Sequence, residues 1–135
     1  MTAADTSVVV AAFASWHEQH DAARRALDDG LWLVEHCALE TYSVLTRLPA
    51  PHRAPADVVR DFIATRFPDP WLRLSAAAYR KFISGLADLD VTGGSVYDAL
   101  VAVTAAAHAV PLITCDRRAI PIYERYRIHV QILNI

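Results

Sequence analysis

The chain has 135 residues, of which 54% are hydrophobic and 21% charged, and its formal net charge is −2. These values exclude a disordered or fibrous protein and suit one compact domain over residues 1–135, while only four glycines argue against a turn-rich all-β fold. The slightly negative charge gives no general reason to bind nucleic acid, so such a substrate must be held by local cations or by bound metal.

The first half of the chain alternates between short apolar runs and amphipathic stretches. Consecutive valines in residues 3–10 are typical of a buried strand, but polar residues interrupt this run after Ala4, so we expect the first strand to end near Asp5. In chain order, the later patterns predict a helix over 16–29, a strand over 31–35, a helix over 37–48, a proline-rich loop, and a helix over 56–67 with Val58 on its inner face.

The second half continues the alternation. Residues 71–74 favour a short third strand, and Ser75 is a suitable N-cap for a helix that reaches about Leu89. The remaining patterns predict a glycine turn at 92–94, a helix over 95–109, a strand over 111–114, a helix over 120–126 and a last strand over 128–133. Strands that alternate with helices in this way predict an α/β fold with a parallel, doubly wound sheet.

Targeting and cysteine signals are weak. The apolar stretch over residues 8–14 is too short for a membrane span and has no basic residue before it, so we expect neither a signal peptide nor a membrane anchor. Cys37 and Cys115 have no metal-ligand spacing and are too few for a disulfide framework. We therefore expect reduced thiols in a cytoplasmic protein.

Asp98 is the acidic residue that most needs an explanation. It lies in a helix that is apolar nearly all round, which is typical of a buried helix. A buried carboxylate needs a compensating partner, because its desolvation costs on the order of several kcal/mol. The alternative is that Asp98 is only a first-turn residue, favoured by the helix dipole.

Two further aspartates come directly after predicted strands, and one glutamate lies in the helix that follows the second predicted strand. Asp5 and Asp116 come at the carboxyl ends of strands, where ligands bind in parallel α/β sheets, although either side chain also suits a turn or a helix cap. Glu40 lies in the helix after the second strand, and taken alone it is more typical of an ordinary solvated helix position.

Taken together, these four carboxylates indicate a single acidic pocket at one edge of the sheet. Such a pocket binds hard divalent cations, which activate water and neutralise charge on a phosphodiester. Arg117 and Arg118 are placed to contact phosphate beside it. A phosphatase with Asp5 as nucleophile is the second enzyme class, but Ser7 stands where the usual second aspartate is required.

Four short motifs occur in a fixed order along the chain. They are Ala3-Ala4-Asp5-Thr6-Ser7-Val8, Leu39-Glu40-Thr41, Val96-Tyr97-Asp98-Ala99-Leu100 and Leu112-Ile113-Thr114-Cys115-Asp116. With the Gly93-Gly94 turn and the closing helix and strand, this order resembles the PIN-domain family over almost the whole chain, and within it the VapC-type toxins of bacterial toxin–antitoxin pairs.

The resemblance implies a three-layer α/β/α fold around a central, mainly parallel sheet. It implies a Mg²⁺-dependent endoribonuclease, with Mn²⁺ as a substitute, that acts as the toxin of a type II pair and cleaves cellular RNA, with tRNA or rRNA favoured. It places Thr6 or Ser7 and Thr114 as supporting hydroxyls, and Asp5 and Asp98 as direct metal ligands. The family's acidic positions correspond to Asp5, Glu40, Asp98 and Asp116.

The same resemblance implies partners. We expect a cognate VapB-type antitoxin and an RNA substrate, and a homodimer or a toxin–antitoxin hetero-oligomer. The helices around residues 22–27 and 56–67 suggest a groove for an amphipathic antitoxin segment. The alternative function is a non-catalytic PIN-like binding protein that keeps an acidic metal pocket.

Overall fold

Parallel strands form the centre of the fold. In the computed structural model, which describes residues 1–133, they make one sheet in the order β2–β1–β3–β4. Ala3 of β1 pairs with Trp32 on one side and with Leu112 on the other, so the first strand lies inside the sheet. The strands are β1 (Ala3–Ala4), β2 (Trp32–Leu33), β3 (Leu112–Thr114) and β4 (Val130–Ile132).

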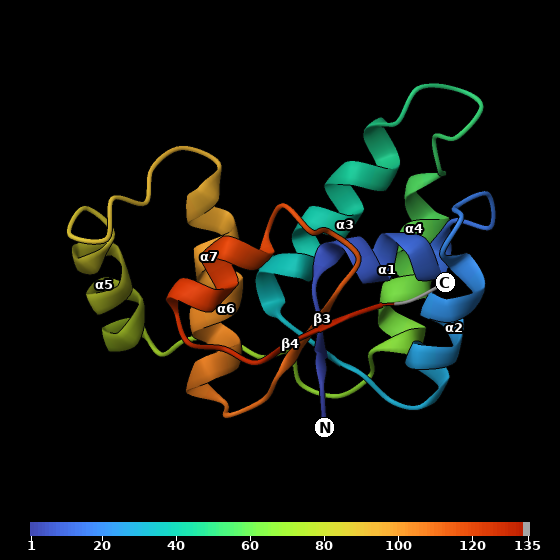
Figure 1. Ribbon diagram of the computed structural model, residues 1–135. Helices are drawn as coiled ribbons and strands as arrows, with labels where there is room; N and C mark the ends of the chain where they lie inside the picture. The colour runs from blue at the N-terminus through green and yellow to red at the C-terminus, as the bar shows by residue number, and fades with distance from the viewer. Residues whose placement is uncertain (134–135) are drawn as a thin grey trace.

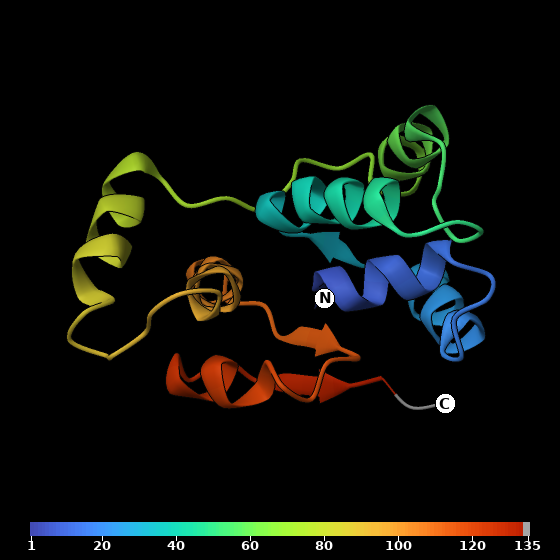
Figure 2. The same ribbon diagram turned by 90° about the horizontal axis from the view of Figure 1, so that it is seen from above.

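Helices cover both sides of this sheet. Figures 1 and 2 show α5, α6 and α7 on one side and α1, α2 and α4 on the other, with α3 leading away from β2. The predicted three-layer α/β/α fold with a parallel sheet is therefore confirmed. The helices are α1 (Thr6–Phe13), α2 (His20–Asp28), α3 (Glu35–Arg47), α4 (Ala56–Arg66), α5 (Ala76–Gly85), α6 (Ser95–Ala107) and α7 (Ile120–Arg125).

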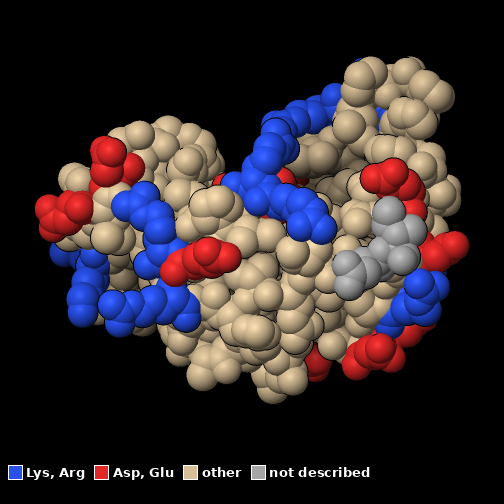
Figure 3. Space-filling model, viewed as in Figure 1, with Lys and Arg blue, Asp and Glu red and all other residues tan. Residues whose placement is uncertain are grey.

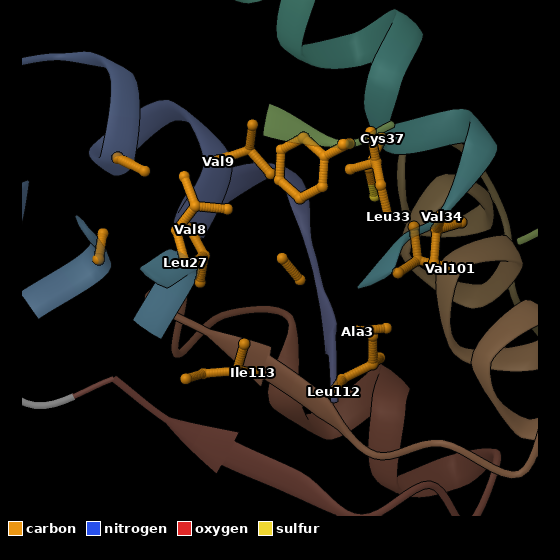
Figure 4. Packing of buried hydrophobic residues seen from close by; sticks show 14 of the residues in the cluster. Ala3, Val8, Val9, Leu27, Leu33, Val34, Cys37, Val101, Leu112 and Ile113 are labelled. Atoms are coloured by element: carbon orange, nitrogen blue, oxygen red, sulfur yellow. The ribbon is translucent and has the colours of Figure 1, made fainter. Parts of the chain in front are cut away.

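The core forms where α1 packs against the sheet. Figure 4 shows Val8 and Val9 of α1 pointing into the same apolar cluster as Leu33 and Leu112 from the strands. Each of these side chains is at most 2% exposed. Full burial of one such side chain stabilises the fold by roughly 1.5–3 kcal/mol, so the valine run holds α1, and with it the end of β1, in a fixed place.

Four local expectations were wrong. Residues 71–74 do not form a strand of the sheet, because only Leu72 pairs, in an isolated bridge with Val34. The helix predicted from residue 16 begins at His20, because the backbone of residues 14–20 turns and the His17 ring accepts a hydrogen bond from the Gln19 amide. The helix after Ser75 ends at Gly85, a poor helix former. Val58 is 48% exposed and faces away from the core.

Residues 134 and 135 of the predicted domain lie outside the described residues. Between residues 1 and 133, no helix combines the length and the apolar character needed to cross a bilayer.

Candidate active site

Asp5 comes directly after β1, at the edge of the sheet where the parallel strands end. Its backbone amide still donates to Ile113 of β3 at 3.2 Å, and its side chain then caps α1 by accepting a hydrogen bond from the Val8 amide at 3.3 Å. The capping alternative is thus correct as a description of local structure. Capping is not the only possible role of Asp5, because a single cap donor uses one of the carboxylate's lone pairs and leaves the others able to accept further bonds.

The Asp5 carboxylate is 3% exposed and is held by two hydroxyl groups. Ser7 donates to Oδ1 at 2.5 Å, and the buried Tyr123 hydroxyl donates to Oδ2 at 2.8 Å. Burial raises the pKa of Asp5, and the hydrogen bonds from its neighbours oppose that rise. The side chain is therefore fixed in orientation at some cost in desolvation.

The hydroxyl of Ser7 also ties the end of β1 to the end of β3. Its oxygen accepts a hydrogen bond from the Cys115 amide at 2.9 Å and lies 3.3 Å from the Thr114 hydroxyl. Thr114 in turn accepts from the Asp116 amide at 2.9 Å. This chain of short contacts sets the position of Asp116 relative to Asp5.

The other two carboxylates come from helices. Glu40 lies on α3, where the neighbouring His36 imidazole, 3.7 Å from the carboxylate, lowers the pKa of Glu40. Asp98 lies in the first turn of α6, where burial and then the carboxylates of Asp116, Glu40 and Asp5 raise the pKa of Asp98 to about 6. The helix dipole alone would lower this pKa, so burial, together with the neighbouring negative charges, outweighs the dipole.

All four predicted carboxylates line one cavity of about 50 Å³. The cavity lies where α1, α3, α6 and the loop after β3 meet, and Thr6, Ser7, Val101 and Tyr123 complete its wall. The Thr6 hydroxyl oxygen is buried and has no hydrogen-bond partner among residues 1–133, which leaves it available to a ligand or water.

The donor set of this cavity suits a hard cation, because it offers carboxylate and hydroxyl oxygens, and a cation would relieve the repulsion that raises the pKa of Asp98. As the side chains stand, no group of three or more His, Cys, Asp and Glu residues within the described chain is arranged to hold an ion. Glu40, Asp98 and Asp116 are partly exposed, so rotation about their side-chain bonds can bring their oxygens closer together.

Positive charge lies at the rim of the acidic cavity. Figure 3 shows Lys and Arg atoms along the upper part of α3 and across the middle of the same face. Arg47 on α3 is exposed and also lowers the pKa of Glu40, although by less than His36 does. Arg117 and Arg118 are exposed beside Asp116, and Asp116 accepts from the Arg118 amide at 3.0 Å and from its Nε at 3.3 Å. An acidic protein therefore carries local cations where a polyanion would approach.

A second, larger cleft lies beside the acidic cavity and is mostly apolar. It has a volume of about 740 Å³, and His36 lines it on the side nearest Glu40. Of the two helices expected to form a groove, α4 lines this cleft and α2 does not, because Ala22 and Leu27 are buried in the core. Binding of an antitoxin segment in the cleft stays a prediction. Apolar residues that line the cleft include Leu39, Tyr42, Ile63, Trp71, Tyr79 and Leu100.

Sequence reasoning missed two residues that contact the carboxylates. Tyr123 is 1% exposed and donates to Asp5, yet the sequence shows only a tyrosine in a short amphipathic helix. The available signal was its spacing of four residues from the buried Ala119, which places both on one helix face. His36 lies one helical turn before Glu40, and that i,i+4 spacing was a sufficient signal for their contact.

Comparisons with known proteins place the chain in a family and agree with its fold. The family described as PIN domain matches residues 3–125. Ribonuclease VapC40 of Mycobacterium tuberculosis is 51% identical over 134 residues, which cover 99% of this chain and 100% of that protein, and Ribonuclease VapC27 of the same species is 42% identical over 95% and 93% of the two chains. The crystal structure of FitAcB from Neisseria gonorrhoeae superposes with a TM-score of 0.67 and 17% identity over 96% of each chain.

Proposed function

This chain belongs to the PIN-domain family, and from that premise we propose that it is an endoribonuclease that hydrolyses phosphodiester bonds of RNA. The observation that carries the proposal is the convergence of Asp5, Glu40, Asp98 and Asp116 on one cavity at the carboxyl edge of the sheet. Similarity over nearly the full length to proteins named Ribonuclease VapC40 and Ribonuclease VapC27 supports the same chemistry.

We assign Asp5 and Asp98 as direct ligands of a divalent cation, with Glu40 and Asp116 completing the site. Magnesium is the proposed ion and manganese its substitute, because both prefer oxygen ligands. Bound there, the cation would lower the pKa of an attacking water and neutralise charge on the phosphodiester.

The protein's own groups have separate tasks in this proposal. Ser7 and Tyr123 hold the Asp5 carboxylate in one orientation and favour its ionised form. His36 keeps Glu40 ionised beside the cavity. Arg117 and Arg118, with Arg47 on α3, attract the RNA backbone and hold phosphates beside the carboxylates, which offsets the net negative charge of the protein.

The biological setting that fits this enzyme is the toxin of a type II toxin–antitoxin pair, acting in the cytoplasm on tRNA or rRNA. A cognate VapB-type antitoxin would cover exposed apolar side chains of the large cleft, such as Leu39, which is 70% exposed. We expect either a homodimer or a toxin–antitoxin hetero-oligomer.

Purified protein incubated with cellular RNA, with and without Mg²⁺ or Mn²⁺, tests the proposal. We expect cleavage that requires the metal and that Asp5→Asn removes while the fold persists. The matched control is Asp69→Asn, because Asp69 is exposed and does not line the cavity. Cleavage by Asp5→Asn would refute the assigned site, whereas metal binding without any cleavage would favour the non-catalytic binding protein.

A further inference from the structure

An exposed aromatic ring stands beside the acidic cavity. The ring of Tyr97 is stacked on the ring of His36, with 5.3 Å between the centroids and an angle of 3° between the planes. Tyr97 directly precedes Asp98 on α6, and His36 lies one helical turn before Glu40 on α3. The stack therefore joins two of the elements that supply carboxylates to the cavity.

Only one face of the Tyr97 ring is covered. Tyr97 is 53% exposed, whereas the side chain of His36 is 20% exposed. A tyrosine that served only to pack α3 against α6 would bury most of its ring, because burial of the aromatic surface is what stabilises such a contact. The exposed ring is instead held parallel to the His36 ring, at the position on α6 that directly precedes Asp98 of the cavity.

We propose that the open face of Tyr97 is a stacking platform for one nucleobase of the bound RNA, a proposal that rests on the ribonuclease function above. A base is the part of RNA that suits this surface, since every base has a flat π-face and the Tyr97 ring carries no positive charge for a phosphate. Phosphates have their own partners at Arg117 and Arg118, beside Asp116. The base on Tyr97 would fix which phosphodiester lies over Asp98.

Binding of short RNA in EDTA tests the platform apart from cleavage. The probes are fluorescein-labelled RNA octamers of randomised sequence, either complete or abasic at one fixed position, with the position varied between pools. For the wild type we expect one abasic position to weaken the Kd about tenfold, the size typical of loss of one stacked base. Tyr97→Leu should weaken binding of the complete octamer about tenfold and lose its sensitivity to that position, while Tyr97→Phe should retain both.

A matched control comes from another exposed aromatic ring stacked on a histidine. Trp16 is 49% exposed, its ring centroid lies 4.3 Å from that of His52, and both residues lie in loops that carry no carboxylate of the cavity. Trp16→Leu should leave the affinity and the abasic profile unchanged. Tyr97→Trp supplies a second readout, because its added fluorescence should be quenched by the complete octamer and not by the one that is abasic at the sensitive position.

The outcomes separate this proposal from the proposed function. A wild type that shows the abasic profile but cleaves no RNA in Mn²⁺ supports the platform and refutes the ribonuclease. A wild type that cleaves, beside a folded Tyr97→Leu that binds and cleaves equally well, overturns the platform alone. Failure of the wild type to bind any octamer also overturns it. A Tyr97→Leu protein that binds RNA like the wild type but has a lower mass by light scattering overturns it too. In that case Tyr97 contacts a second copy of the chain and not a base.

Discussion

The hydroxyl of Tyr123 donates a 2.8 Å hydrogen bond to Oδ2 of Asp5, across 118 positions of the chain, and both side chains are buried. The contact locks α7 to the end of β1. The orientation and the pKa of the carboxylate proposed as a metal ligand therefore depend on Tyr123, which takes no part in the proposed reaction itself.

Tyr123→Phe removes this donor and keeps the ring. We expect a loss of about 1–3 kcal/mol in the free energy of unfolding, because a buried carboxylate oxygen loses its partner. The Tyr123 hydrogen bond lowers the pKa of Asp5, so its loss should raise that pKa further and move the rise of activity to higher pH. Thermal melts and a pH–rate profile measure both effects. Tyr79→Phe is the control, since Tyr79 is 44% exposed on α5, and equal effects of the two substitutions would contradict the assigned role.

Asp98 makes the metal-free protein sensitive to pH. Its pKa is raised from 3.8 to about 6, so its contribution to stability is fully present below the unfolded value and is lost as pH rises through about 6. Asp98→Asn should flatten this dependence in the presence of a chelator. The expected gain relative to wild type at pH 7 is about 1 kcal/mol, after allowance for solvent screening of a partly exposed group. A mutant that is less stable by about 0.3–1 kcal/mol and still cuts RNA would show that Asp98 is only a helix-dipole residue.

Divalent metal should stabilise the native protein. If the cation binds the assembled carboxylates as proposed, and not the unfolded chain, Mg²⁺ or Mn²⁺ at a hundred times its Kd should add about 2.7 kcal/mol and raise the melting temperature. Asp98→Asn should abolish cleavage and most of this shift. If the mutant melts with the same metal-induced shift as the wild type, Asp98 is not a ligand.

The apolar cleft can be tested with one pair of substitutions. Leu39→Ser places a hydroxyl in the cleft, and we expect binding of the neighbouring gene's product to weaken about tenfold or more, as for other central apolar contacts. Val58→Ser is the control, because Val58 is similarly exposed on α4 but does not line the cleft. Both proteins should keep their stability within about 0.5 kcal/mol. Equal loss of binding in the two variants would place the partner elsewhere.

The alternation of strands and helices was sufficient to predict the parallel, doubly wound sheet, and the family resemblance added the three-layer α/β/α arrangement. Because Asp5 and Asp116 follow strands that became neighbours, their approach to one another followed from topology alone. The topology did not predict the contact between Tyr123 and Asp5, because this contact depends on how α7 packs against the sheet. A tyrosine in a short helix is compatible with many ways of packing that helix. Residues 71–74 were predicted as a strand on composition, which carries no information on whether a partner with free backbone groups lies alongside.

The place of β1 within the sheet has a consequence for synthesis. The first strand lies between β2 and β3, so residues 3 and 4 have a partner on one side only until residues 112–114 exist. The cavity wall needs still later residues, since Tyr123 closes over Asp5. On the ribosome the cavity therefore stays incomplete until residue 123, which is 118 positions after Asp5, has emerged, and the order of the strands itself delays the assembly of the site.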